Sequence, residues 1–201
     1  MQLLQDFYLQ EDVVQIARDL LGKFLVTYID GERSVGKIVE TEAYRGPEDK
    51  ASHAYSNRRT ARTEIMFAEG GAAYVYLCYG IHHLFNVVTN VRDVPHAVLI
   101  RALEPVENVE LMLLRRGMSQ LKPNLTAGPG ALAQAMGIRT LHSGISLITK
   151  ESLIKIEDRG CRIDEQDIIA SARVGVGYAQ EWAAIPWRFR LKNSIWTSKA
   201  K

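Results

Sequence analysis

Cysteine is scarce in this chain, which has only Cys78 and Cys161 among its 201 residues. Two cysteines cannot build a disulfide framework or a cysteine-rich zinc site. The five histidines are scattered, and none belongs to a His-Glu-x-x-His helix of the zinc-protease type. We therefore expect a protein of a reducing compartment that holds no metal and no other cofactor.

Membrane-length apolar runs, targeting segments, repeats and a large charge of one sign are also missing. We therefore expect a cytoplasmic protein that does not associate with a membrane. No Pro-, Gly- or Ser-rich linker divides the chain, so residues 1–201 are expected to form one domain. The formal net charge of +2 permits a nucleic-acid partner without requiring one.

Residues 39–55, VETEAYRGPEDKASHAY, carry a high density of chemically useful side chains. Residues two apart on a strand point to the same face. A strand over 36–44 would therefore present on one face Ile38, Glu40, Glu42 and Tyr44. His53 would arrive from the loop that follows. A carboxylate beside an aromatic ring suits a pocket for a flat substrate, although an edge strand whose acids face water would show the same spacing.

Residues 70–90, GGAAYVYLCYGIHHLFNVVTN, predict a β-hairpin with a tight turn at Tyr79-Gly80. A large aromatic side chain at a hairpin tip is costly to expose unless a partner receives it. Insertion between base steps is one known use of such a residue. Tyr74 is better explained as a core residue with a hydrogen-bonded hydroxyl group. For Tyr79 we favour a binding role over packing within the hairpin.

Strands outnumber helices in the expected order of elements. Apolar residues at helical spacing predict a helix that begins near Val13 and ends at Gly22. A second helix is expected from Pro105 to Gly117, and a third over 129–136. Besides the hairpin, strands are expected over 23–30, 36–44, 97–103, 144–149, 153–157, 168–174 and 186–192. Several are joined by short turns, which predicts an α+β fold with a largely antiparallel sheet.

Five segments resemble, in the same order, motifs of the alkyladenine (3-methyladenine) DNA glycosylase family. They are VETEAYRGPEDKASHAY, MFAEGGAAYVYLCYGIHHLFNVV, AVLIRALEP, TAGPGALAQAMGI and ARVGVGYAQEWAAIPWRF. The resemblance runs from about residue 11 to Trp196. It implies a curved sheet with flanking helices and a protruding hairpin, as in formyltransferase C-terminal domains. It also implies a monofunctional base-excision repair enzyme, expected as a monomer, which acts on double-stranded DNA and is nucleoid-associated when bound.

Such an enzyme flips a damaged purine from the duplex and hydrolyses its N-glycosidic bond, leaving an abasic site. The resemblance assigns water activation to Glu42 and a hold on the water or sugar-phosphate to Arg101. Spacing alone does not choose Glu42 over Glu40, and an ion pair with Glu104 would also explain Arg101. The damaged purines that remain open are 3-methyladenine, 7-methylguanine, hypoxanthine and ethenoadenine.

The resemblance also assigns the residues that would hold the flipped base. Tyr44, His53 and Tyr76 match its stacking walls, Asn86 matches a residue that discriminates purines, and Tyr79 matches the intercalating wedge. A core histidine is the alternative for His53.

Two other activities are compatible with parts of the sequence. A non-catalytic nucleic-acid-binding module of the same fold is the main alternative, although the presence of Glu42 argues against it. A glycosylase that also cleaves the strand would need an amine nucleophile in the pocket. The nearest strand lysine, Lys37, alternates onto the face away from Glu42.

Overall fold

The long strand β2 (Glu32–Arg45) organises the sheet of this computed structural model, which describes residues 1–199. One edge of β2 pairs with β5 (His96–Glu107). The other edge pairs first with β1 (Phe24–Ile29) and then, over residues 40–42, with β8 (Arg188–Leu191). The C-terminal part of the chain is thereby joined to the half of β2 that carries the motif glutamates.

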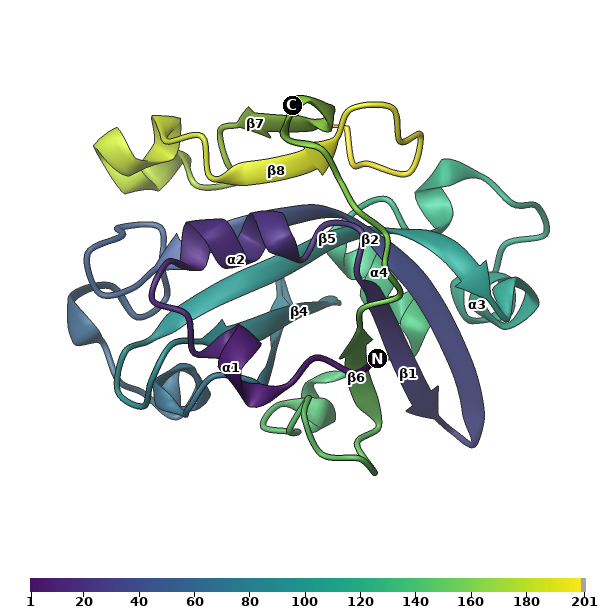
Figure 1. Ribbon diagram of the computed structural model, residues 1–201, viewed down its shortest axis with the longest axis horizontal. Coiled ribbons are helices and arrows are strands. Elements are labelled where there is room, and N and C mark those ends of the chain that lie inside the picture. The colour runs from purple at the N-terminus through teal and green to yellow at the C-terminus, as the bar shows by residue number, and fades with distance from the viewer. Residues whose placement is uncertain (200–201) are drawn as a thin grey trace.

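The eight-stranded sheet follows the order β3-β4-β5-β2-β1-β6, with β8 pairing to β2 and β7 to β8 (Figure 1). The ladders that join these strands are antiparallel. The remaining strands are β3 (Ala73–Cys78), β4 (His82–Thr89), β6 (Ile154–Glu157) and β7 (Ile168–Ser171). The α+β class and the largely antiparallel sheet predicted from the sequence are confirmed.

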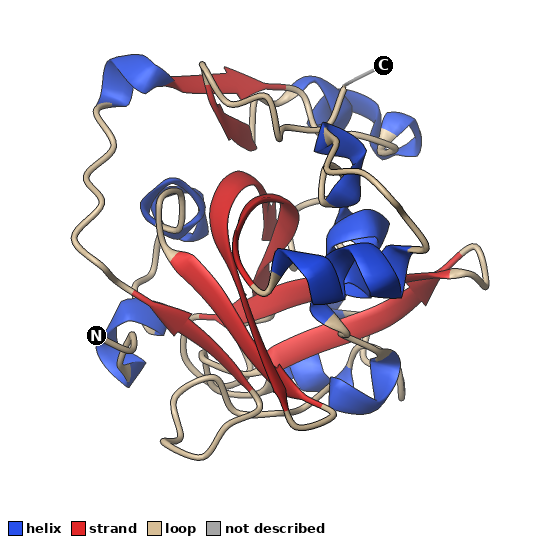
Figure 2. Ribbon diagram, turned by 90° about the vertical axis from the view of Figure 1, so that its right-hand side faces the viewer, coloured by secondary structure: helices blue, strands red, loops and turns tan. Residues whose placement is uncertain are grey.

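Helices cover the sheet and complete its core (Figure 2). Their bounds are α1 (Gln5–Tyr8), α2 (Val13–Asp19), α3 (Val109–Arg116) and α4 (Pro129–Met136). Asp12 caps α2 by accepting a hydrogen bond from the Val14 amide at 2.9 Å. Buried side chains of α2 and α4 join one cluster with the sheet. Within residues 1–199, no helix has the length and apolar character needed to cross a membrane.

The strand β5 has one face in this core and the other toward a cavity. Val98 and Ile100 are fully buried in the core cluster. Leu99 and Arg101, which alternate with them, line a cavity on the other side. The period of two along one strand thus divides side chains that stabilise the fold from those that face the cavity.

The expected helix from Pro105 is wrong in its start. β5 continues through Pro105 to Glu107, and the helix begins at Val109. Pro105 pairs with Gly36 next to a register shift between β2 and β5. A proline lacks the amide donor of a regular ladder, and a bulge is one of the few places where a strand tolerates it.

Two further expectations about strands need correction. Residues 144–149 form no strand, and only an isolated bridge joins Ser146 to Ala72. Residues 36–44 are a strand, but Ile38 does not share the face of Glu40, because the ladder with β5 shifts register between them. Ile38 instead packs in the same core cluster as Ala43. The bulge therefore reverses the alternation at Val39.

Candidate active site

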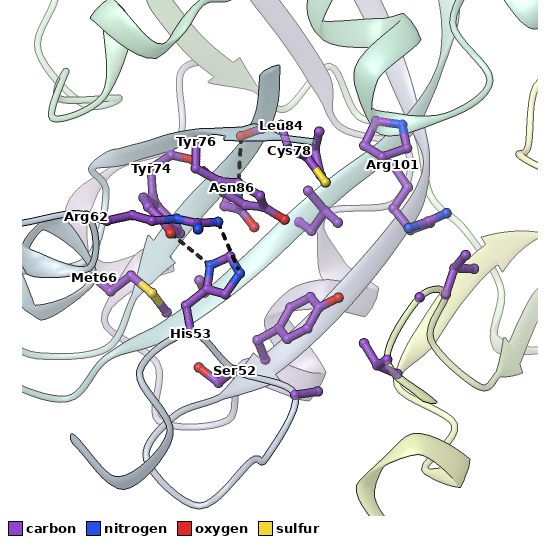
Figure 3. A pocket seen from close by; sticks show the side chains of 18 of the residues that line it. Ser52, His53, Arg62, Met66, Tyr74, Tyr76, Cys78, Leu84, Asn86 and Arg101 are labelled. Carbon is purple, nitrogen blue, oxygen red and sulfur yellow. Dashed lines mark hydrogen bonds between the residues drawn. The ribbon is translucent and has the colours of Figure 1, made fainter. Parts of the chain in front are cut away.

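A cavity of about 520 Å³ opens between the end of β2, the β3–β4 hairpin and residues 174–178 (Figure 3). This volume is within the usual range for a small-molecule site. The predicted site residues that line it are Tyr44, His53, Tyr76, Tyr79, Asn86 and Arg101. Glu42 is fully buried beneath them. The structure thus brings together residues that the sequence distributes over 60 positions.

Glu42 is held by three groups from different elements. The Tyr44 hydroxyl donates to its Oε2 at 2.8 Å, and the Val174 amide donates to its Oε1 at 2.8 Å. Nη1 of Arg101 lies 3.3 Å from the same Oε1. Burial and the neighbouring Glu42 carboxylate raise the pKa of Tyr44 well above its ordinary value, so Tyr44 remains a donor.

Glu40 is equally buried, but it accepts four hydrogen bonds, which is about the full capacity of a carboxylate. Its Oε1 accepts from Nε of Arg101 at 2.8 Å, Nε of Arg188 at 2.7 Å and Oγ of Ser198 at 2.7 Å. Its Oε2 accepts from the Ser198 amide at 2.6 Å. Burial alone would raise the pKa of Glu40, but the Arg101 charge and the hydrogen bonds lower it below its ordinary value. The surroundings therefore distinguish two glutamates that strand spacing could not.

Arg101 does not pair with Glu104, the partner that a purely structural role would have used. Glu104 is engaged by Lys37 at 2.6 Å. Arg101 instead contacts both Glu40 and Glu42, and only 6% of its surface is exposed.

His53 and Tyr76 form an aromatic wall. Their ring centroids are 4.7 Å apart at an interplanar angle of 78°. Nδ1 of His53 lies 2.9 Å from the Tyr74 hydroxyl, and Nε2 lies 3.3 Å from Nη2 of Arg62 (Figure 3). Because an arginine only donates, Nε2 is the acceptor, and the proton of neutral His53 is on Nδ1. Burial, followed by the charges of Arg62 and Arg58, lowers the pKa of His53 to about 4.

Asn86 lies on β4 at the side of the cavity and is 4% exposed. Its Nδ2 donates to the backbone oxygen of Tyr74 at 3.1 Å and to that of Leu84 at 3.4 Å. These bonds fix the amide at its nitrogen end, so the oxygen end is the one left to contact a ligand.

Tyr79 occupies the tip of the hairpin and is 90% exposed. It has a φ of 51° and Gly80 has a φ of 73°, as the two central residues of a type I′ turn require. The apolar side chains of Leu77 and Ile81 beside it are also exposed. Packing within the hairpin, the alternative considered for Tyr79, is therefore wrong.

Residues 6–195 match the profile of the family described as Methylpurine-DNA glycosylase (MPG). The chain belongs to this family. It is similar to three bacterial proteins that are each named "Putative 3-methyladenine DNA glycosylase".

These relatives cover nearly the whole chain. The protein of Chlamydia abortus is 47% identical over 94% of this chain and 97% of its own length. That of Natranaerobius thermophilus is 44% identical over 98% and 99%, and that of Bacillus cereus strain G9842 is 45% identical over 99% and 100%. The resemblance noted in the sequence is confirmed, and the protein is an N-glycosylase of DNA repair.

Several supporting residues of this glycosylase had no role in the sequence-based interpretation. Arg173 forms a buried ion pair with Asp49, and its Nη2 donates to Oδ1 at 2.8 Å. Its guanidinium carbon lies 4.8 Å from the centroid of the Tyr44 ring and 5.3 Å from that of Trp187. Residues 174–176, which directly follow Arg173, line the cavity.

No signal in the sequence pointed to Arg188 or Ser198, because their contacts depend on the return of the chain to β2. Residues 1–199 contain no group of three or more His, Cys, Asp or Glu side chains that could hold a metal ion.

Proposed function

We propose that the protein flips alkylated or deaminated purines from duplex DNA and hydrolyses the N-glycosidic bond with a water activated by Glu42. The proposed range comprises 3-methyladenine, 7-methylguanine, hypoxanthine and ethenoadenine. The observation that carries this proposal is the position of Glu42, buried beneath an aromatic cavity and fixed by Tyr44, the Val174 amide and Arg101.

The reaction needs a negative charge close to the sugar. Cleavage of the bond develops an oxocarbenium-like cation, which a carboxylate stabilises. The same carboxylate accepts a proton from the attacking water. Glu42 retains acceptor capacity for that water, because an ionised carboxylate accepts about four hydrogen bonds, whereas Glu42 accepts one from Tyr44 and one from Val174 and has one further contact, with Nη1 of Arg101 at 3.3 Å. Arg101 would hold the water or the sugar-phosphate.

The cavity walls suit a purine. Tyr44 on one element and His53 with Tyr76 on others supply rings against which a flat base can stack. Each base-to-aromatic contact contributes about 1–3 kcal/mol. A purine alkylated on a ring nitrogen is electron-poor, so it gains cation–π attraction and leaves without a dedicated acid. Asn86 would then distinguish purines by the groups on their edges.

Tyr79 would fill the gap that the flipped nucleotide leaves in the duplex. A non-glycine residue with a positive φ costs about 1–2 kcal/mol, and Tyr79 gains nothing from packing in return. Its exposure at the tip, next to Leu77 and Ile81, supports a role in contacting a partner.

A water nucleophile implies that the product is an intact abasic site. Lys37 is paired with Glu104, and Lys50 donates to Gln180 at 2.6 Å and Glu181 at 2.7 Å. Neither lysine lines the cavity. We therefore expect no Schiff base between enzyme and DNA.

The test measures base release from four duplexes, each with one of these purines, under single-turnover conditions. Release of at least one base, with strand cleavage only after added alkali, is the expected result. Lesion binding without base release would instead identify a non-catalytic module. A complex trapped by borohydride would contradict the water mechanism.

A further inference from the structure

Four charged side chains lie close together in the protein interior beneath the cavity, and of these only Arg101 lines it. Glu40, Glu42 and Arg188 are fully buried, and Arg101 is 6% exposed. The two carboxylates and two guanidinium groups have no net charge together. Buried charges are tolerated when they are paired and hydrogen-bonded. Arg188, whose Nε bonds Glu40 at 2.7 Å, supplies the second positive charge of this set.

Ser198 closes the set from the C-terminal segment. Its amide and its hydroxyl both donate to Glu40, at 2.6 and 2.7 Å. The same hydroxyl lies 3.3 Å from Nη2 of Arg101 and 3.3 Å from Nη2 of Arg188. The Ser198 carbonyl accepts from Nη2 of Arg188 at 2.9 Å. One residue thus contacts three of the four charged groups.

The consequence concerns how Arg101 meets Glu42. Nε of Arg101 is held by Glu40, and Nη2 is held by Ser198. Only Nη1 reaches Glu42, at 3.3 Å. An unrestrained guanidinium tends to form a bidentate contact with a carboxylate. Such a contact would take both Glu42 oxygens and leave less room for a water.

We propose that Glu40, Arg188 and Ser198 form a positioning clamp that keeps Arg101 in one-sided contact with Glu42. This inference rests on the proposed catalytic function of Glu42. None of the three clamp residues lines the cavity. Their action is therefore on the rate of base release through Arg101 and Glu42, and not on the binding of the flipped base.

The first test uses Ser198→Ala in the full chain, because this change keeps all four charges and the backbone hydrogen bond to Glu40. Thr197→Ala is the matched control, since its hydroxyl donates to the Ser194 carbonyl and does not contact the clamp. Single-turnover excision of a methylpurine or hypoxanthine duplex and the Kd for the same duplex are measured together. We expect Ser198→Ala to slow excision severalfold with Kd changed less than twofold, and Thr197→Ala to behave as wild type.

The second test separates positioning from folding. Glu40→Gln should slow excision by about 100-fold, the loss that a misplaced reacting group can cause, and it should lower Tm because two arginines then face one carboxylate. The double variant Glu40→Gln/Arg188→Met removes one charge of each sign. It should recover Tm but not the rate, because Arg101 still lacks its anchor.

Other results would contradict the positioning role of the clamp. Recovery of both Tm and rate in the double variant, or wild-type excision by folded Ser198→Ala, would reduce the clamp to a structural element. Equal losses of rate and affinity would contradict the inference as well. Glu42→Gln is measured in parallel: normal excision by that variant would overturn the proposed function itself, whereas its inactivity with normal clamp variants would overturn only the clamp.

Discussion

At the scale of single residues, Glu40 and Glu42 show how surroundings set the chemistry of identical side chains. Both are fully buried on β2. Glu40 is saturated by Arg101, Arg188 and Ser198. Glu42, buried beneath the cavity, accepts only the hydrogen bonds from Tyr44 and Val174 and contacts Arg101. Only the second arrangement suits a general base.

Glu42→Gln should therefore retain lesion binding and lose most base release. Glutamine has the same size but cannot accept the proton of the water or stabilise the sugar cation. General-base groups contribute about 100- to 10,000-fold to a rate, and we expect a loss in this range. Single-turnover excision and a Kd for the lesion duplex measure the two effects. Near-normal excision would show that the wrong carboxylate was chosen.

His53 should remain neutral well below neutral pH. Its pKa is lowered to about 4 by burial and by the charges of Arg62 and Arg58, against an ordinary value of 6.5. The unfolded chain binds a proton at His53 near pH 6.5, whereas the folded protein binds it only near pH 4. The free energy of unfolding should therefore be independent of this group above about pH 6.5 and should decrease as the pH falls from 6.5 toward 4.

The side-chain NMR signals of His53 report this titration directly. We expect a midpoint near 4 in the wild type and a higher midpoint in Arg62→Gln, which removes one repelling charge. A wild-type midpoint near 6.5 would mean that water solvates the ring.

At the scale of elements, the hairpin of β3 and β4 places Tyr79 at its exposed tip and Tyr76 in the wall of the cavity. Tyr79→Ala should lower the population of flipped nucleotide, because flipping costs a few kcal/mol of unstacking and unpairing. Excision should slow more for a lesion in a stable pair than for one in a pre-opened bulge. Tm should be unchanged, since Tyr79 is exposed.

Tyr44→Ala is the comparison, because it removes a wall of the cavity and should slow excision in both contexts. A Tyr79→Ala protein that excises paired and pre-opened lesions with unchanged relative rates would contradict the role of the wedge.

The elements that the sequence predicted well are those with a strong local signal. The Tyr79-Gly80 turn and the helix after Gly128-Pro129 are of this kind. The shift at Val39 and the course of β5 through Pro105 are not, because both depend on the register of a partner strand. Residues 144–149 are apolar enough for a strand, but the only bridge they form is an isolated one between Ser146 and Ala72, just before β3. Local patterns do not encode these long-range pairings.

At the scale of the whole molecule, buried ion pairs fasten the C-terminal third to the sheet and the first motif. Asp49 and Arg173 are paired with both side chains fully buried. Asp49→Asn leaves the arginine charge uncompensated. Breaking a buried pair in this way costs about 3–5 kcal/mol, and in a chain of this size it should lower Tm by roughly 10 °C.

Glu104→Gln provides the control for this effect. It breaks a partly exposed pair with Lys37, and such pairs contribute about 0–1 kcal/mol. Thermal unfolding of the two variants side by side gives the comparison. Equal Tm values would contradict the importance of the buried pair.

The separation of contacting residues along the sequence explains which parts of the candidate site were predictable. The short motifs of residues 39–55 and 70–90 contain Tyr44, His53, Tyr76, Tyr79 and Asn86, which line one cavity, and Glu42, which is buried beneath it. Asp49 also lies in the first motif, but the sequence does not reveal its partner, Arg173, which lies 124 residues away. Ser198 lies in a segment without any catalytic pattern, and only the packing of β8 against β2 gives it a role.

The hydrogen bond between Ser198 and Glu40 joins residues 158 positions apart, which has a consequence for folding during synthesis on the ribosome. A ribosome adds about 5–20 residues per second, so roughly 8 to 30 s separate the synthesis of the two partners. Until Ser198 leaves the exit tunnel, Glu40 lacks its amide and hydroxyl donors. A nascent chain therefore cannot complete the hydrogen bonds of Glu40 until Ser198 has been synthesised and has left the ribosome.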